Sequence, residues 1–209
     1  MIRFNCDYGE GAHPLIMQRL METNYEQTVG YSEDPYCASA REKIRIACDC
    51  PEAAVHFLVG GTQANMTVIA AALRPYEGVL CAETGHINVH ETGAIESTGH
   101  KCLALPHQNG LISGSQVAVA AATQADDEHT VRPGMVYISM STELGTMYNR
   151  SQLKDLYYTC KQLGLYLFID GARLGYGLAA LPEVDLPFLA SVCDAFTIGG
   201  TKCGLLFGQ

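Results

Sequence analysis

The stretch SQLKDLYYTCKQLGLYLFIDGAR, from Ser151 to Arg173, contains the alternation that decides the fold. Residues 151–164 have the amphipathic spacing of a helix that closes on Gly164. Residues 165–170 then form an unbroken apolar run, which is typical of a strand buried on both faces of a parallel sheet. A helix followed directly by such a strand predicts an α/β fold.

The same alternation extends on both sides of this stretch. Helical patterns begin at the glycines at 60–61 and at His90, and another covers 113–125. Apolar runs typical of strands lie at 54–59, 78–83, 101–106, 135–140 and 195–199, with one more just begun at 205–208. We therefore expect residues 51–209 to form an α/β domain, with a mostly parallel sheet and helices on both faces.

The first fifty residues have a different pattern, without strand-like runs. PLIMQRLMETN (14–24) and CASAREKIRIACDC (37–50) are predicted helices, joined through the loop YSEDPY (31–36). We expect residues 1–50 to form an N-terminal helical segment that packs on the α/β body.

Composition limits the classes of partner. The chain has 209 residues, 48% of them hydrophobic, which suits one sizeable domain, or one domain and a piece of another. The formal net charge is −9, so we expect no nucleic-acid partner and no anionic membrane partner. The longest apolar stretch, Val68–Leu73, is far too short to span a bilayer. A local basic pocket for one small anion remains compatible with this charge.

The cysteines and histidines give little indication of a metal. The nine cysteines are odd in number and contain no CxxC, so we interpret them as free thiols in a reducing cytoplasm. The N-terminus has no apolar signal-peptide core, which also indicates a cytoplasmic protein. His86 and His90 are four apart beside Glu91, but the zinc-peptidase pattern needs Glu where Ile87 stands. We expect no metal site.

Chemically distinct groups follow the predicted strands. After 54–59, a helix begins with Gly61, Thr62 and Gln63. His86 follows 78–83. Asp170 ends 165–170, and Arg173 lies three residues beyond it. Lys202 follows 195–199. Because ligands of an open parallel sheet bind beyond the carboxyl ends of its strands, these groups are expected to converge at one edge.

Together these groups match the needs of pyridoxal 5'-phosphate. A helix N-terminus binds phosphate, and a desolvated Lys202 can form a Schiff base. Asp170 would keep the pyridine nitrogen protonated, so that the ring acts as an electron sink, and His86 would stack on the ring. Each residue also has an ordinary alternative: Lys202 on the surface, Asp170 as a cap, Arg173 paired with Asp170, and His86 as one of seven histidines.

Six segments, in order along nearly the whole chain, resemble the low-specificity L-threonine aldolases, in the β-eliminating lyase group of fold-type-I pyridoxal-phosphate enzymes. The segments are FNCDYGEGAHP (4–14), YSEDPYCASARE (31–42), FLVGGTQAN (57–65), TGHINVHETGA (84–94), FIDGARLGYGL (168–178) and TIGGTKCGLL (197–206). The resemblance implies an aspartate-aminotransferase-like large domain. It also implies cleavage of β-hydroxy amino acids to glycine and an aldehyde by a homodimer or homotetramer.

The resemblance also implies site roles. Lys202, His86 and Asp170 would be catalytic, and Gly61, Thr62, Gln63, His86, Asp170, Arg173 and Lys202 would bind the cofactor. His86 would help move the proton of the substrate hydroxyl. Cys6, Arg173 and Tyr31 would contact the amino acid substrate, with Tyr31 reaching the site of a neighbouring subunit.

Some positions depart from the family pattern. Cys6 and Thr201 stand where serine is usual, and residues 141–149 differ from the usual Glu-Asn-Thr type. The family continues into a small C-terminal domain with a second carboxylate-binding arginine, so we expect a chain truncated at its C-terminal end. The alternatives are β-elimination, racemisation or transamination of another amino acid, and a non-catalytic truncated domain.

Overall fold

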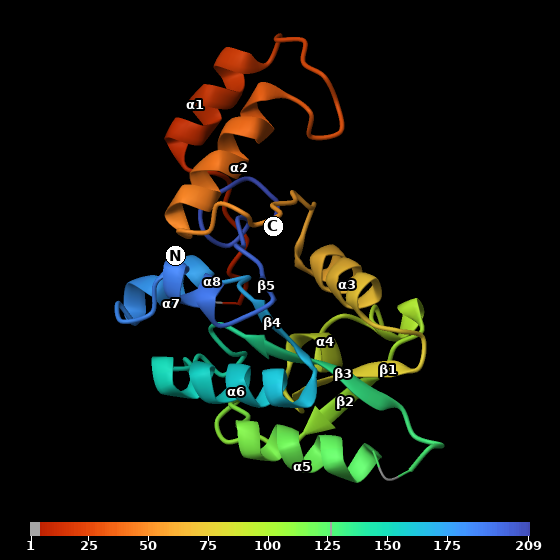
Figure 1. Ribbon diagram of the computed structural model, residues 1–209. Coiled ribbons are helices and arrows are strands. Elements are labelled where there is room, and N and C mark those ends of the chain that lie inside the picture. Colours follow the sequence, from red (N-terminus) through yellow and green to blue (C-terminus); the bar gives the residue numbers. More distant parts are fainter. Residues whose placement is uncertain (1–4, 126) are drawn as a thin grey trace.

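The computed structural model describes residues 5–125 and 127–209, and its centre is a parallel sheet (Figure 1). The sheet has five strands in the order β2-β1-β3-β4-β5, and every neighbouring pair is parallel. The strands are β1 (Glu77–Ala82), β2 (Cys102–Leu105), β3 (Arg132–Ser139), β4 (Tyr166–Asp170) and β5 (Ala195–Phe196). The predicted α/β class with a mostly parallel sheet is confirmed.

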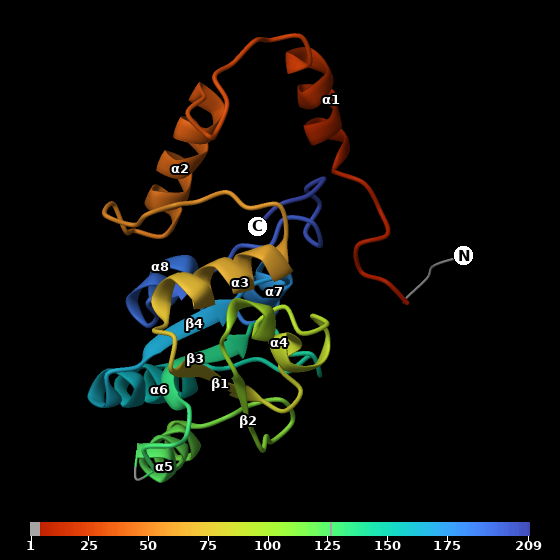
Figure 2. The ribbon, with the colours of Figure 1, turned by 90° about the vertical axis from the view of Figure 1, so that its right-hand side faces the viewer.

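Helices cover both faces of the sheet, as Figure 2 shows for α3 and α6. On one face, α3 (Gly61–Ala72) and α4 (His86–Val89) bury Ile69 and Ile87 against alternate residues of β1, β3 and β4. On the other face lie α5 (Gly114–Ala125), α6 (Arg150–Leu163), α7 (Leu174–Ala180) and α8 (Leu186–Ser191). Because successive side chains of each strand enter opposite cores, the strands are apolar throughout.

Capping residues explain where α6 begins and where it ends before β4. The side-chain oxygen of Asn149 accepts a hydrogen bond from Gln152 N at 3.0 Å, and Gln152 Oε1 accepts one from Asn149 N at 2.9 Å. This capping box begins α6, and Gly164 ends the helix in the left-handed region at φ 69°. The chain then enters β4, whose residues 167–170 are buried.

Two predicted strands do not form, and a third is shorter than predicted. Residues 54–59 lie outside the sheet, where Leu58 exchanges two backbone hydrogen bonds with Gln209, and none of the six is buried. Residues 205–208 form turns and bends, and β5 covers only residues 195–196 of the predicted 195–199. Apolar composition predicted strands at these places. Residues 54–59 and 205–208 are not part of the sheet, and β5 pairs with β4 only through residues 195–196.

The helix predicted from His90 is also wrong. The helix α4 begins earlier, at His86, and His90 is its C-cap. Thr92 and Gly93 then adopt positive φ values of 56° and 75°, which a right-handed helix excludes. The next helical turn is the short 3-10 helix η1 (Glu96–Thr98).

The N-terminal helices α1 (Pro14–Thr23) and α2 (Pro35–Ala47) stand apart from the sheet in both ribbon views (Figures 1 and 2). Neither helix contains a buried residue. The side chains of Arg41 and Arg45 donate to backbone oxygens of residues 55 and 53, and His13 N donates to Gly204 O. The division into a segment 1–50 and a body 51–209 stays a prediction.

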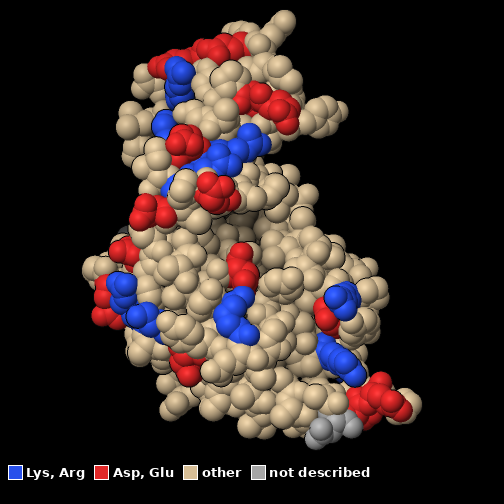
Figure 3. All heavy atoms as spheres, viewed as in Figure 1, with Lys and Arg blue, Asp and Glu red and all other residues tan. Residues whose placement is uncertain are grey.

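Surface charge is mixed. Figure 3 shows acidic and basic side chains interspersed on one face, with no extended basic area among the described residues drawn there. Within the described ranges, no helix has the length and apolar character needed to cross a membrane. All nine cysteines are free thiols.

Candidate active site

The candidate site lies at the carboxyl edge of the sheet, where the strand order reverses between β1 and β3. Chain connections leave this edge in opposite directions, which creates the crevice where α/β proteins bind ligands. Asp170 is the last residue of β4, and His86 and Glu143 lie four residues beyond the ends of β1 and β3. The structure therefore brings predicted site residues from separate segments to one edge.

Asp170 is the buried anion of this edge. Only 4% of the residue is exposed. Its Oδ2 accepts hydrogen bonds from the Tyr137 hydroxyl at 2.6 Å and from Asn65 Nδ2 at 3.0 Å, and its Oδ1 accepts one from Ala172 N at 2.9 Å. These donors satisfy the hydrogen-bonding capacity of a carboxylate that burial removes from water.

Two glycines join the loop after β4 to the loop after β5. Gly171 N donates to Thr197 Oγ1 at 2.8 Å, and Gly199 N donates to Gly171 O at 2.9 Å. A Cβ at Gly171 would lie 1.9 Å from Thr197 O, and one at Gly199 would lie 2.4 Å from Ala172 O. The two backbones can approach this closely only without side chains. This joint brings the segment of Lys202 beside Asp170.

Lys202 is a largely buried amine. Its side chain is 15% exposed, and its Nζ lies 4.0 Å from Asp7 Oδ1. Burial lowers the pKa of Lys202, and the neighbouring positive charge of Arg173 lowers it further, against the opposing effects of Asp7, Asp170 and Glu143. The lowered pKa makes the neutral, nucleophilic amine more accessible.

Arg173 pairs with Asp7, rather than with Asp170. Its Nε donates to Asp7 Oδ2 at 2.5 Å, and its Nη2 donates to Asp7 Oδ1 at 3.4 Å. Burial acts to raise the pKa of Asp7, but the Arg173 hydrogen bond and the Lys202 charge outweigh it, so this pKa is lowered. Asp7 thus links both cations to the N-terminal segment.

His86 is held from two sides. Its Nδ1 lies 2.8 Å from Glu91 Oε1, and its backbone N donates to Glu143 Oε1 at 3.1 Å. The hydrogen bond to Glu91 raises the pKa of His86, although burial opposes the rise. The His90 ring lies 5.5 Å away, centroid to centroid. Its side chain is still 30% exposed, so the ring remains accessible to a ligand.

The start of α3 has the geometry of an anion site. The N-cap Gly60 provides no side-chain hydrogen bond. The N–H groups of the first helical turn, which include those of Gly61, Thr62 and Gln63, lack partners within the helix. The Gln63 side chain closes the preceding turn, because its Oε1 accepts from Val59 N at 2.9 Å.

Two of the predicted substrate-binding residues are exposed to solvent. Tyr31 is 100% exposed. Cys6 is also exposed, although it precedes Asp7, which contacts Arg173 and lies near Lys202. Within the described ranges, no group of three or more His, Cys, Asp or Glu residues could hold a metal.

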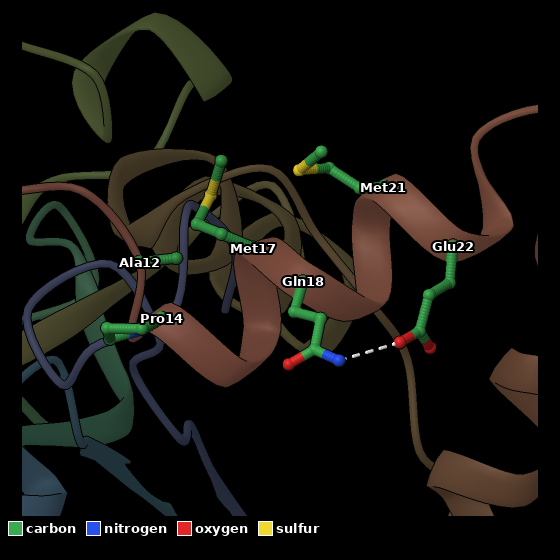
Figure 4. Close-up of a pocket in the computed structure, with 6 residues that line it drawn as sticks. All are labelled: Ala12, Pro14, Met17, Gln18, Met21 and Glu22. Atoms are coloured by element: carbon green, nitrogen blue, oxygen red, sulfur yellow. Dashed lines mark hydrogen bonds between the residues drawn. The ribbon is translucent and has the colours of Figure 1, made fainter.

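A shallow hollow on the surface lies away from these residues, along α1 (Figure 4). It is lined by Ala12, Pro14, Met17, Gln18, Met21 and Glu22, and by none of the predicted site residues. We do not assign it to the candidate site.

Sequence reasoning missed several polar residues that complete the site. They are Asp7, Asn65, Glu91, Tyr137 and Glu143. Asn65 lies one helical turn after Gly61, a spacing that could have indicated it. Tyr137 offered no signal, because a tyrosine within an apolar strand resembles any other core residue.

Comparison with solved structures identifies the fold class. A Leishmania major threonine aldolase matches 97% of this chain and 59% of its own, with 43% identity and a TM-score of 0.94. An alanine–glyoxylate aminotransferase from Nostoc, at 19% identity, matches 95% of this chain with a TM-score of 0.61 and shares the fold. The parallel sheet and its carboxyl-edge site thus define an aminotransferase-like α/β protein.

Comparison with families is more specific. The beta-eliminating lyase family model matches residues 10–206. The chain belongs to the beta-eliminating lyase family. A low specificity L-threonine aldolase of Pseudomonas aeruginosa is 33% identical over 99% of this chain, and a second from Escherichia coli O157:H7 is 27% identical over 80%. The chain spans 60% of the length of the Pseudomonas protein and 49% of the Escherichia coli protein.

Proposed function

We propose that this chain carries the site of a pyridoxal-phosphate-dependent carbon–carbon lyase of the threonine aldolase type. The proposed reaction cleaves L-threonine or a related β-hydroxy amino acid to glycine and an aldehyde. The observation that carries the proposal is the glycine joint at Gly171 and Gly199, which brings a buried carboxylate and a buried lysine together. The names of the Pseudomonas aeruginosa and Leishmania major relatives support the same reaction.

The residues present fit pyridoxal phosphate. The first turn of α3, at Gly61 and Thr62, would hold its phosphate. Asp170, held by hydrogen bonds from Tyr137, Asn65 and Ala172, would pair with a protonated ring nitrogen. His86, with an accessible ring, would stack on the cofactor, and Lys202 would hold it covalently.

When bound, pyridoxal phosphate supplies an electron sink for the electrons released at Cα. The chain's own residues orient the substrate and move protons. Arg173 would bind an anionic oxygen of the substrate or cofactor, with Asp7 fixing the guanidinium. His86 would accept the proton of the substrate hydroxyl at Nε2, since its Nδ1 is engaged with Glu91.

The second candidate is β-elimination, which the family description favours. The same buried carboxylate and lysine would serve it, because the reaction depends on which bond at the substrate is oriented for cleavage. Incubation with L-threonine distinguishes the two, because aldol cleavage yields glycine and acetaldehyde. Products from cysteine or tyrosine, without these two, would favour β-elimination.

The cofactor proposal is tested by trapping. Pyridoxal phosphate is added to the chain, the visible spectrum is recorded, and borohydride reduction is followed by peptide mapping. We expect the label on Lys202, and expect Lys202→Arg to lose both the band and the label. Lys101→Arg, at an exposed lysine, is the matched control and should retain them. Label spread evenly over the other lysines would contradict the proposal.

We further propose a cytoplasmic homodimer or homotetramer. Nine free thiols support a reducing compartment. Exposed apolar residues on α1, such as Leu15 and Met21 at 68% and 76%, support burial against another subunit. Light scattering coupled to size exclusion measures the mass, and a monomer at all concentrations would contradict the oligomer.

A further inference from the structure

A continuous line of buried polar contacts joins His86 to Asp170. Glu91 Oε1 lies 2.8 Å from His86 Nδ1 and accepts a hydrogen bond from Asn65 Nδ2 at 2.7 Å. The same Asn65 nitrogen donates to Asp170 Oδ2 at 3.0 Å. The Glu91 side chain is fully buried. The amide of Asn65 thus uses both of its hydrogens to bridge two carboxylates.

The Glu91 carboxylate contacts the His86 imidazole through its Oε1. Its Oε1 receives both contacts, whereas its Oε2 is buried without a hydrogen-bond partner among the described residues. A buried carboxylate is costly unless a cation or donor compensates it. The nearest group able to become a cation is His86. A proton held at His86 Nδ1 therefore stabilises Glu91.

The backbone brings these residues together through a turn. His86 is the first residue of α4, and Glu91 follows its C-cap His90. The positive φ values of Thr92 and Gly93 reverse the chain directly after Glu91. A spacing of five residues would not place two side chains on one helical face, so this turn creates the contact.

We propose that Glu91 is the positioning residue of His86, and that it holds the proton on Nδ1, so that Nε2 is the nitrogen that exchanges protons with a substrate. Asn65 keeps the Glu91 carboxylate in place and links it to Asp170. The role of His86 toward a substrate rests on the proposed function, but the geometry of the Glu91–His86 pair does not.

Other charged groups also face His86. Asp170 approaches from β4 and Glu143 from the loop after β3, while His90 lies beside the ring. Glu143 accepts from the backbone N of His86, not from its ring. Among the described residues, only Glu91 is hydrogen-bonded to the imidazole, and it is the main cause of the raised pKa of His86. Removing the Glu91 charge should therefore lower this pKa more than removing the Glu143 charge.

The first test is an NMR titration of the histidines in the chain without added cofactor. His86→Asn identifies the His86 signal among the seven histidines. We expect Glu91→Gln to shift the His86 titration to lower pH. Glu83→Gln, at an exposed carboxylate three residues before His86, is the matched control and should leave it unchanged. An unchanged His86 titration in folded Glu91→Gln, or an equal shift in Glu83→Gln, would overturn the proposal.

The second test needs no variant at the pair. Above its pKa, the neutral His86 of the unmodified chain should carry its proton on Nδ1, which nitrogen–proton correlation spectra distinguish from the Nε2 form. An Nε2–H tautomer would refute the positioning role even if Glu91→Gln failed to fold. Both readouts are made without cofactor or turnover. A wrong reaction assignment would therefore leave them intact, and a wrong Glu91 assignment would not affect cofactor trapping on Lys202.

Discussion

At the scale of single residues, the central feature is a carboxylate whose charge is supported by neutral donors. Asp170 receives hydrogen bonds from Tyr137, Asn65 and the backbone of Ala172. No lysine or arginine is among these three donors. Such an arrangement leaves Asp170 able to pair with a cationic ligand.

Removing one donor should measure this support. In Tyr137→Phe, the buried carboxylate loses its shortest hydrogen bond, at 2.6 Å. We expect the free energy of unfolding to fall by about 1.5–3 kcal/mol, the range for hydrogen bonds to charged groups. Urea denaturation at neutral pH measures the change. Tyr158→Phe, at a 60% exposed position, should change stability by less than about 0.5 kcal/mol, and equal effects would contradict this account.

The sequence predicted the charged and nucleophilic members of the site, but not the residues that support them. Asp170 and Lys202 could be predicted because Asp170 ends one apolar strand-like run and Lys202 lies three residues after another. Asn65 and Tyr137 reach the site through tertiary packing, between residues up to 105 positions apart. Glu91 was noticed beside two histidines, but its contact depends on a turn after α4 that local pattern did not predict.

At the scale of elements, the close contact between the loops after β4 and β5 holds the segment of Lys202 beside Asp170. Gly171→Ala would place a methyl group 1.9 Å from the backbone oxygen of Thr197, which cannot move without displacing its loop. We expect a loss of about 1–3 kcal/mol or more in unfolding free energy, together with weaker cofactor trapping at Lys202. Thermal and urea unfolding report the first effect.

Gly11→Ala provides the comparison for this prediction. A Cβ at Gly11 would meet no atom within 4 Å. This substitution should therefore leave stability nearly unchanged, within about 0.5 kcal/mol. If Gly171→Ala were as well tolerated as Gly11→Ala, the two backbones would not be in the close contact described above.

Elements with their own boundary signals were predicted well, and those defined by a partner were not. The α6–β4 unit carries its capping box and its terminal glycine within its own sequence. Residues 54–59 are as apolar as a real strand, but they pair with Gln209 instead of joining the sheet. Whether an apolar run becomes a strand depends on an available neighbour, which composition does not reveal.

At the scale of the whole molecule, burial is uneven. The strands β3 and β4 are almost entirely buried, whereas α1 and α2 contain no buried residue. Most of the apolar contact therefore lies in the body around the sheet. The N-terminal helices depend on a few backbone contacts, such as His13 N to Gly204 O.

This distribution predicts unequal local stability. In the monomeric chain, amide hydrogens of α1 should exchange with solvent much faster than those of β3 and β4, because local opening of α1 exposes little apolar surface. Hydrogen exchange followed by mass spectrometry measures the difference. Leu20→Ala on α1 should lower the free energy of unfolding only slightly, whereas Leu156→Ala in the core should lower it by about 2–5 kcal/mol. Equal protection of α1 and β3 in the monomer would contradict this account.

The backbone contact at Gly171 and Gly199 has a consequence for building chimeras between relatives. Because each loop fits closely against the other's main chain at Gly171 and Gly199, residues 170–173 and 197–202 should be exchanged together. A crossover placed between them would combine two surfaces that never evolved together. Crossovers that keep both segments from the same parent should preserve the spacing between the carboxylate and the amine.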